Sequence, residues 1–103
     1  MIARQYEIYW VNLNPTRGSE INKIRPCVIV SPDDMNNYLN TIIIAPITST
    51  EKSYPFRVSC DTGNIALDQL RTVDKMRLKD FIQKLNDVNI LQVKRVLNEM
   101  LVQ

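Results

Sequence analysis

Prolines divide the first half of this chain into short pieces. All five prolines of the 103 residues fall within the first 55, at Pro15, Pro26, Pro32, Pro46 and Pro55. The runs between them are rich in β-branched and aromatic residues, which favour strands. Turn-forming residues cluster where these runs end. This half is therefore predicted to form a compact β-structure with tight loops.

The apolar runs place the expected strands. We predict strands at residues 6–13, 25–31, 40–47 and 56–60, then a turn at 61–64 and a hairpin partner at 65–72. The first strand is nearly apolar on both faces and should be covered on both sides. We expect a helical turn or short loop at 32–37, a polar connection at 51–54, a helical turn at 74–78 and a last strand at 80–85.

The C-terminal stretch has the period of an amphipathic helix. Asp87 is the expected N-cap of a helix over residues 88–102. Its apolar face would carry Ile90, Val93, Val96, Leu97, Met100 and Leu101, and its polar face Gln92, Lys94, Arg95, Asn98 and Glu99. The predicted class is α+β. It is one domain over residues 1–103, with a mostly antiparallel, bent sheet or small β-barrel and a C-terminal helix.

The composition excludes several kinds of site. The chain has no His, which removes the commonest metal ligand and acid/base group. Its two cysteines, Cys27 and Cys60, are too few for a zinc site. We expect both to be buried as small apolar residues, with a disulfide or a reactive thiol as the alternatives. Only two glycines are present, so no glycine-rich phosphate loop exists. No metal or cofactor is expected.

Hydropathy and net charge limit where the protein can reside and which ligands it can bind. No apolar run approaches the roughly 20 residues that a membrane helix needs, and the N-terminus lacks the apolar core of a signal peptide. We therefore expect a cytoplasmic protein that does not enter membranes. A net charge of +2 means that nucleic-acid binding would require a local basic patch.

A polar loop that ends in an Arg next to a Pro suggests an anion site. Because the residue before a proline is pushed towards extended geometry, Arg25 should start a strand with its side chain held by the scaffold. The loop before it carries Arg17, Ser19 and Glu20. Thr48 ends another apolar run, so Arg25 and Thr48 meet if their strands are neighbours. The alternatives are an Arg that binds loop carbonyls and a Thr with a satisfied hydroxyl.

Without His or a metal, phosphodiester cleavage would most plausibly act on RNA. RNA supplies its own nucleophile, the 2′-hydroxyl, so that the enzyme positions it and neutralises charge. Glu20 or Asp68 is then the candidate base, because Arg stays protonated. Aromatic residues beside Arg17, Lys23, Lys52 or Arg57 would stack on single-stranded bases. As an alternative role, Arg71 and Asp74 would simply pair with each other.

An ordered set of segments resembles the MazF/PemK family of toxin endoribonucleases. These segments are residues 8–20, 25–31, 45–48, 54–56 and 67–74. The resemblance implies a homodimeric, SH3-like barrel that cleaves single-stranded RNA at a short preferred sequence without a metal. The products would be a 2′,3′-cyclic phosphate and a 5′-hydroxyl. The partner would be an antitoxin whose C-terminal segment occupies the RNA groove.

The resemblance also assigns residues. It implies Arg25, Thr48 and Glu20 as catalytic, whereas Asp68 matches a carboxylate that some PemK-type members use. The predicted RNA-binding residues are Arg17, Ser19, Lys23, Lys52, Tyr54, Arg57, Asp68, Gln69 and Arg71.

The chain also departs from the family's patterns. PemK-type members carry an Arg where this chain has Ala66, and some carry a His in place of Ser19. The chain therefore resembles the version of the site that uses Arg and Thr. It also departs from the family's usual loop at residues 21–24. The alternative function is a non-catalytic or gyrase-directed toxin-like binding module on the same fold.

Overall fold

The computed structural model describes residues 3–14, 23–49 and 55–102. Its strands are β1 (Glu7–Asn12), β2 (Ile24–Ile29), β3 (Thr41–Thr48), β4 (Arg57–Cys60), β5 (Gly63–Ala66), β6 (Arg71–Asp74) and β7 (Leu78–Lys84). Its helices are α1 (Asp33–Tyr38) and α2 (Asp87–Leu101), with 3₁₀ turns η1 (Leu67–Gln69) and η2 (Lys75–Arg77). None of the helices in these ranges is long and apolar enough to cross a membrane.

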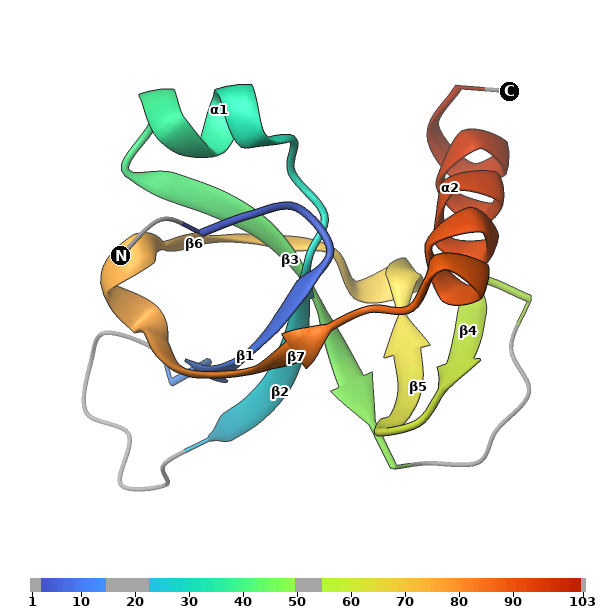
Figure 1. Cartoon of the computed structure of the whole chain (residues 1–103), viewed down its shortest axis with the longest axis horizontal. Coiled ribbons are helices and arrows are strands. Elements are labelled where there is room, and N and C mark those ends of the chain that lie inside the picture. Colours follow the sequence, from blue (N-terminus) through green and yellow to red (C-terminus); the bar gives the residue numbers. More distant parts are fainter. Residues whose placement is uncertain (1–2, 15–22, 50–54, 103) are drawn as a thin grey trace.

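The strands form one antiparallel, strongly curved sheet. The pairing order is β4-β5-β3-β2-β1-β7, and β6 pairs with β3 off this path. In Figure 1, β6, β3, β2, β1 and β7 curve into a ring, and α2 stands over β4 and β5. The turn η2 connects β6 to β7, and no pairing between these two strands, both of which the structure describes, closes the ring. The predicted α+β, barrel-like fold is confirmed, with a sheet that does not close.

Strand β3 holds the sheet together because it pairs on both edges. One edge pairs with β2, from Cys27↔Pro46 to Ile29↔Ile44. The other edge pairs with β6 through Thr41 to Ile44, and with β5 through Ile47 and Thr48. The change of partner falls at Ala45 and Pro46. A proline within a strand is tolerated at such a break, where it removes no ladder bond.

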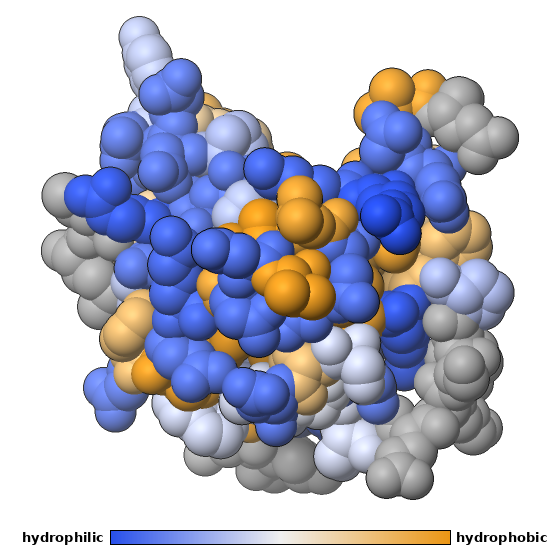
Figure 2. All heavy atoms as spheres, turned by 45° about the vertical axis from the view of Figure 1, so that its right-hand side comes forward, coloured by the Kyte–Doolittle hydropathy of each residue, from blue (hydrophilic) through white to orange (hydrophobic). Residues whose placement is uncertain are grey.

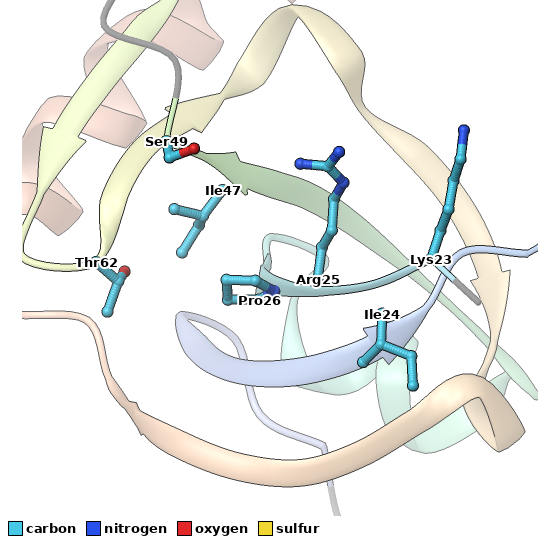
Figure 3. Close-up of a pocket in the computed structure, with 7 residues that line it drawn as sticks. All are labelled: Lys23, Ile24, Arg25, Pro26, Ile47, Ser49 and Thr62. Carbon is cyan, nitrogen blue, oxygen red and sulfur yellow. The ribbon is translucent and has the colours of Figure 1, made fainter. Parts of the chain in front are cut away.

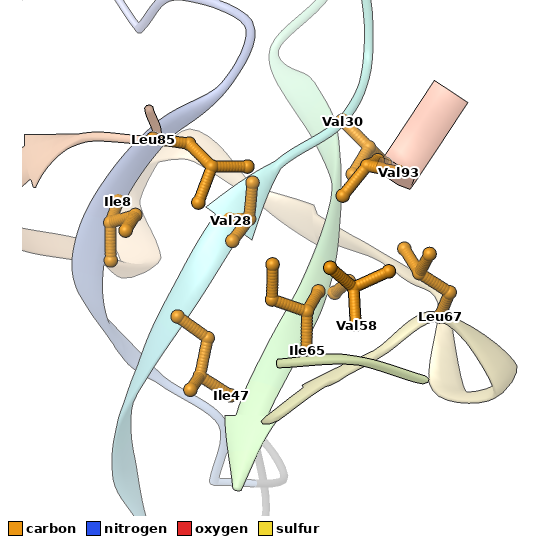
Figure 4. Packing of buried hydrophobic residues seen from close by; sticks show 10 residues of the cluster. Ile8, Val28, Val30, Ile47, Val58, Ile65, Leu67, Leu85 and Val93 are labelled. Atoms are coloured by element: carbon orange, nitrogen blue, oxygen red, sulfur yellow. The ribbon is translucent and has the colours of Figure 1, made fainter. Parts of the chain in front are cut away.

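Two hydrophobic cores lie on opposite faces of β1, β2 and β3. Along β2, Val28 faces the core that β4, β5 and α2 cover, whereas Cys27 and Ile29 face the other core. The first core comprises Ile8, Val28, Val30, Ala45, Ile47, Val58, Ile65, Leu67, Leu85 and Val93 (Figure 4). The second comprises Ala3, Tyr9, Val11, Leu13, Cys27, Ile29, Ile42, Ile44 and Val73. Strand β1 contributes to both, so the expectation that it is covered on both sides is confirmed.

The C-terminal helix lies where the periodicity placed it, but two details were wrong. Asn86, rather than Asp87, is the N-cap, because its side-chain oxygen accepts a bond of 2.8 Å from the backbone N–H of Asn89. Leu101 does not face the core and is 66% exposed. Val93 is fully buried and anchors the helix on the first core.

The predicted hairpin partner at 65–72 is also wrong as a single strand. Strand β5 starts at Gly63 and ends at Ala66, η1 follows, and β6 begins at Arg71. The interruption buries the Leu67 side chain in the first core. It also carries the chain from one end of β3 to the other, where β6 pairs with Thr41 to Ile44.

Gly63 provides a test of this packing. Its φ is +138°, and a Cβ built on it would lie 2.6 Å from the carbonyl oxygen of Thr48. We expect Gly63→Ala to destabilise the fold by about 1–3 kcal/mol, since both the conformation and the contact are unfavourable for Ala. Urea unfolding measures the effect. Asp61→Ala, in the same turn and exposed, should stay within about 0.5 kcal/mol of the parent. Equal stabilities of the two variants would contradict the packing.

Candidate functional site

Pairing of β2 with β3 makes neighbours of the two strands that carry Arg25 and Thr48. The register runs Ile29↔Ile44, Val28↔Ala45 and Cys27↔Pro46. Continued by two residues beyond its last pair, this register would set Arg25 opposite Thr48. At these positions Arg25 pairs with Val11 of β1, and Thr48 pairs with Asn64 of β5. Side chains alternate along a strand, so Arg25 and Thr48 lie on the same face as the Cys27–Pro46 pair. The sequence-based condition that the two strands be neighbours is therefore confirmed.

A hollow of about 480 Å³ lies beside Arg25. It is lined by Lys23, Ile24, Arg25, Pro26, Ile47, Ser49 and Thr62. Figure 3 shows that the side chains of Lys23 and Arg25 extend to the same side of their segment, whereas Ile24 points away from them. Arg25 is exposed at this rim, whereas Thr48 is half-buried and is not among the residues that line the hollow. The rim therefore presents two cations beside backbone and hydroxyl groups, which suits an anionic ligand.

Arg71 lies on the same face of the sheet. It pairs with Ile44, which in turn pairs with Ile29, so Arg71 shares a face with Cys27 and Arg25. Burial raises the pKa of the Cys27 thiol to about 12, while the charges of Arg71 and Arg25 act in the opposite direction. Both guanidiniums thus lie close enough to act on one buried thiol. Arg71, a predicted RNA-binding residue, therefore shares a face with Arg25 but does not line the hollow.

Arg57 and Asp68 form a separate pair. The Arg57 guanidinium donates to the two carboxylate oxygens of Asp68 at 3.0 and 3.4 Å. These hydrogen bonds from Arg57 hold the pKa of Asp68 below its usual value. Arg57 lines a different hollow of about 220 Å³, together with Gln92 and Arg95 of α2. Neither Arg57 nor Asp68 lines the hollow beside Arg25.

Of the other predicted site residues, one is described by the structure and five are not. Gln69 is exposed at the end of η1. Arg17, Ser19, Glu20, Lys52 and Tyr54 lie outside the described residues. Within the described part of the chain, no ion pair joins Arg71 to Asp74, so that alternative is wrong. Instead, a side-chain oxygen of Asp74 accepts a bond of 2.8 Å from the backbone N–H of Met76.

Sequence reasoning missed both hydroxyl residues that line the hollow, Ser49 and Thr62. Ser49 follows Thr48 in a run of hydroxyl residues, which was a usable signal. Thr62 belongs to the turn between β4 and β5, and nothing local connects it to Arg25. It reaches the hollow because β5 pairs with the end of β3.

The thiols and acidic groups show no metal cluster. Among the described residues, no three or more Cys, Asp or Glu side chains gather as ligands. Cys27 and Cys60 are both free thiols, so the alternative of a disulfide is wrong.

Comparison with known families gives one match over nearly the whole chain. Residues 4–101 match the model of the PemK-like, MazF-like toxins of type II toxin–antitoxin systems. A protein of Staphylococcus saprophyticus named endoribonuclease MazF is 33% identical, over 94% of this chain and 89% of its own. A protein of Staphylococcus epidermidis with the same name is 32% identical, over the same shares.

Solved structures share the fold. MazF in a MazE–MazF crystal structure from Deinococcus radiodurans superposes with a TM-score of 0.86 at 24% identity, over 98% of this chain and 96% of the other. An endoribonuclease bound to its cognate antitoxin, from a mycobacterial species, gives a TM-score of 0.84 at 19% identity. That match covers 96% of this chain and 94% of the other. At these identities the likeness concerns the fold.

The burial of Cys27 predicts unequal thiol reactivity. Cys27 is fully buried and has a pKa of about 12, whereas Cys60 is partly exposed. Because the thiolate is the reactive form, an aromatic disulfide reagent at pH 8 should modify Cys60 promptly and Cys27 only as the protein unfolds. Absorbance of the released thiolate measures both phases. Cys60→Ser should remove the fast phase. Two thiols reacting at one rate would contradict the assignment.

Proposed function

The chain belongs to the family of PemK-like, MazF-like toxins of type II toxin–antitoxin systems, and from this premise we propose that it is an endoribonuclease. It cleaves single-stranded RNA at a short preferred sequence without a metal, and thereby inhibits translation and growth. The single observation that supports this proposal is the β2–β3 register, which would set Arg25 opposite Thr48 if it were continued by two residues beyond Cys27↔Pro46.

The proposed reaction uses the nucleophile within the RNA. The 2′-oxygen loses its proton and bonds to phosphorus, and the bond from phosphorus to the 5′-oxygen breaks. The 5′-oxygen takes up a proton, so that the products are a 2′,3′-cyclic phosphate and a 5′-hydroxyl. Negative charge grows on the phosphate oxygens in the transition state. A group that donates hydrogen bonds to those oxygens therefore accelerates the step.

Arg25 has the chemistry for that role. Its guanidinium is a cation with several N–H donors and is exposed at the rim of the hollow. The Thr48 hydroxyl would donate to the same phosphate and fix its orientation. Arg25 is also the candidate donor of the proton to the leaving 5′-oxygen. Glu20 remains the candidate base, and it lies outside the described residues.

The surface around Arg25 fits an RNA backbone. Lys23, Arg25 and Arg71 carry positive charge on the face that contains Cys27. Such groups neutralise phosphates and give salt-dependent affinity. Arg57, Asp68 and Gln69 remain proposed RNA contacts on the β4–η1 side, together with Arg17, Ser19, Lys52 and Tyr54 outside the described residues.

The proposed partners are an antitoxin and a second copy of the chain. The antitoxin's C-terminal segment would occupy the groove that binds RNA, in the cytoplasm. Exposed apolar side chains support a protein partner, and they include Trp10, Ile24, Phe81, Val88 and Leu91. Figure 2 shows apolar side chains gathered near the centre of one largely hydrophilic face. Apolar surface of this kind is commonly covered by another chain.

The alternative of a gyrase-directed or non-catalytic binding module has less support. Both Staphylococcus relatives at 32–33% identity are named endoribonucleases. A protein-binding module also has no need of a cation and a hydroxyl carried on one face by two neighbouring strands.

The proposal predicts how single variants cleave RNA in EDTA. Arg25→Ala should lower the cleavage rate of a long single-stranded RNA by on the order of 100- to 1000-fold, because a charged transition-state donor is lost. Gel electrophoresis of the products measures the rate. Lys79→Ala, which removes the same charge from an exposed site on β7, is the matched control and should cleave normally. Cleavage by Arg25→Ala at the parent rate would refute the mechanism.

A further inference from the structure

The corner between β6 and β7 holds a guanidinium that the proposed reaction does not use. Arg77, the last residue of η2, donates through Nη1 to the backbone carbonyl of Asn12 at 3.3 Å and also to the carbonyl of Asn14. The partners are 65 and 63 residues away in sequence. Asn12 ends β1, and Asn14 directly precedes residues 15–22. One side chain therefore ties the end of β1 to the far corner of the sheet.

The turn that carries Arg77 is itself held in place. A side-chain oxygen of Asp74 caps η2 by accepting from the Met76 N–H at 2.8 Å. The Lys75 N–H donates to the carbonyl of Asn40 at 2.9 Å. Because its base is fixed and a guanidinium is planar, Arg77 loses little conformational freedom when it binds the two carbonyls.

Asn14, which Arg77 binds, is itself bonded to the segment that leads into β2. Its side-chain oxygen accepts a bond of 2.6 Å from the backbone N–H of Lys23. The Leu13 N–H donates to the Lys23 carbonyl at 2.8 Å. These bonds join the segment before residues 15–22 to the segment after them. Lys23, which accepts one bond and donates the other, lies two residues before Arg25.

A second path connects the same groups through the sheet. Arg25 pairs with Val11 across β2 and β1, and Val11 pairs with Leu78 across β1 and β7. Leu78 directly follows Arg77. Val11 is fully buried, so this row of backbone is fixed by the second core. A shift of the backbone at Arg77 would therefore be transmitted through Leu78 and Val11 to the position of Arg25.

We propose that Arg77 is a positioning residue for the RNA-cleaving site. It holds Asn12 and Asn14, Asn14 holds Lys23, and this chain of bonds sets where Lys23 and Arg25 present their charges. Arg77 touches neither the hollow beside Arg25 nor the reacting phosphate in this scheme. The catalytic part of the inference rests on the proposed function, whereas the bonding part does not.

The test compares three variants of the full chain. Arg77→Gln removes the charge and most of the donors, and Arg77→Lys keeps the charge with a shorter reach. Lys79→Gln removes an equal charge from an exposed site on β7 and is the control. NMR hydrogen exchange follows the amides of Leu13 and Lys23, with Val30 as the reference because it donates to Ile43 at 2.9 Å in the sheet. Cleavage of a short fluorogenic RNA gives kcat and KM.

We expect Arg77→Gln to accelerate exchange at Leu13 and Lys23 by about tenfold and to leave Val30 within about twofold of the parent. Its kcat should fall by about tenfold with KM nearly unchanged, since misplacement of Arg25 weakens transition-state rather than ground-state binding. Arg77→Lys should recover part of both effects, and Lys79→Gln should match the parent.

Three results would overturn the inference. The first is unchanged exchange at Leu13 and Lys23, and the second is equal acceleration at all three amides, which indicates general destabilisation. The third is faster exchange at the two amides with an unchanged kcat. If the parent protein does not cleave RNA, the proposed function fails, and the exchange pattern alone then decides whether Arg77 joins these segments.

Discussion

The antiparallel pairing of β2 with β3 is the constraint on which the rest of the molecule depends. Both strands contribute buried side chains to both cores, so a slip of one residue would exchange the side chains of the two cores. It would also turn Arg25 from the rim towards the face of Val28. The register that fills the cores is therefore the same register that makes neighbours of the strands that carry Arg25 and Thr48. Core packing and the geometry of the site cannot vary independently here.

Local patterns predicted the elements that depend mainly on local physics. The apolar runs located β1, β2, β3 and β4, and the helical period located α2. The missed features depend on distant neighbours. Residues 65–72 read as one strand, because their composition does not show that Leu67 must turn into a core or that β6 must cross to the far end of β3. Asn86 and Asp87 are both good capping residues, so composition does not choose between them, and only the bond from the Asn89 N–H to the Asn86 side chain identifies the cap.

The same division holds for the site. Arg25 and Thr48 were identifiable because a proline fixes the strand start and hydroxyls mark a strand end. The ion pair of Arg57 with Asp68 was not, since it joins β4 to η1 across 11 residues of chain. Arg77 gave no signal either, because its partners are more than 60 residues away. The residues proposed to react were marked by local patterns, whereas the residue proposed to hold them in position is recognised only in the folded chain.

The central claim is that Arg25 and Thr48 act on one phosphate as a unit. A double-mutant cycle of Arg25→Ala and Thr48→Ala, read as single-turnover rates of RNA cleavage, tests it most directly. If the two groups cooperate, the double variant should be little slower than Arg25→Ala alone, because Thr48 has less to contribute once its partner is gone. Rate losses that simply multiply would show that the two residues act independently, and would contradict the claim.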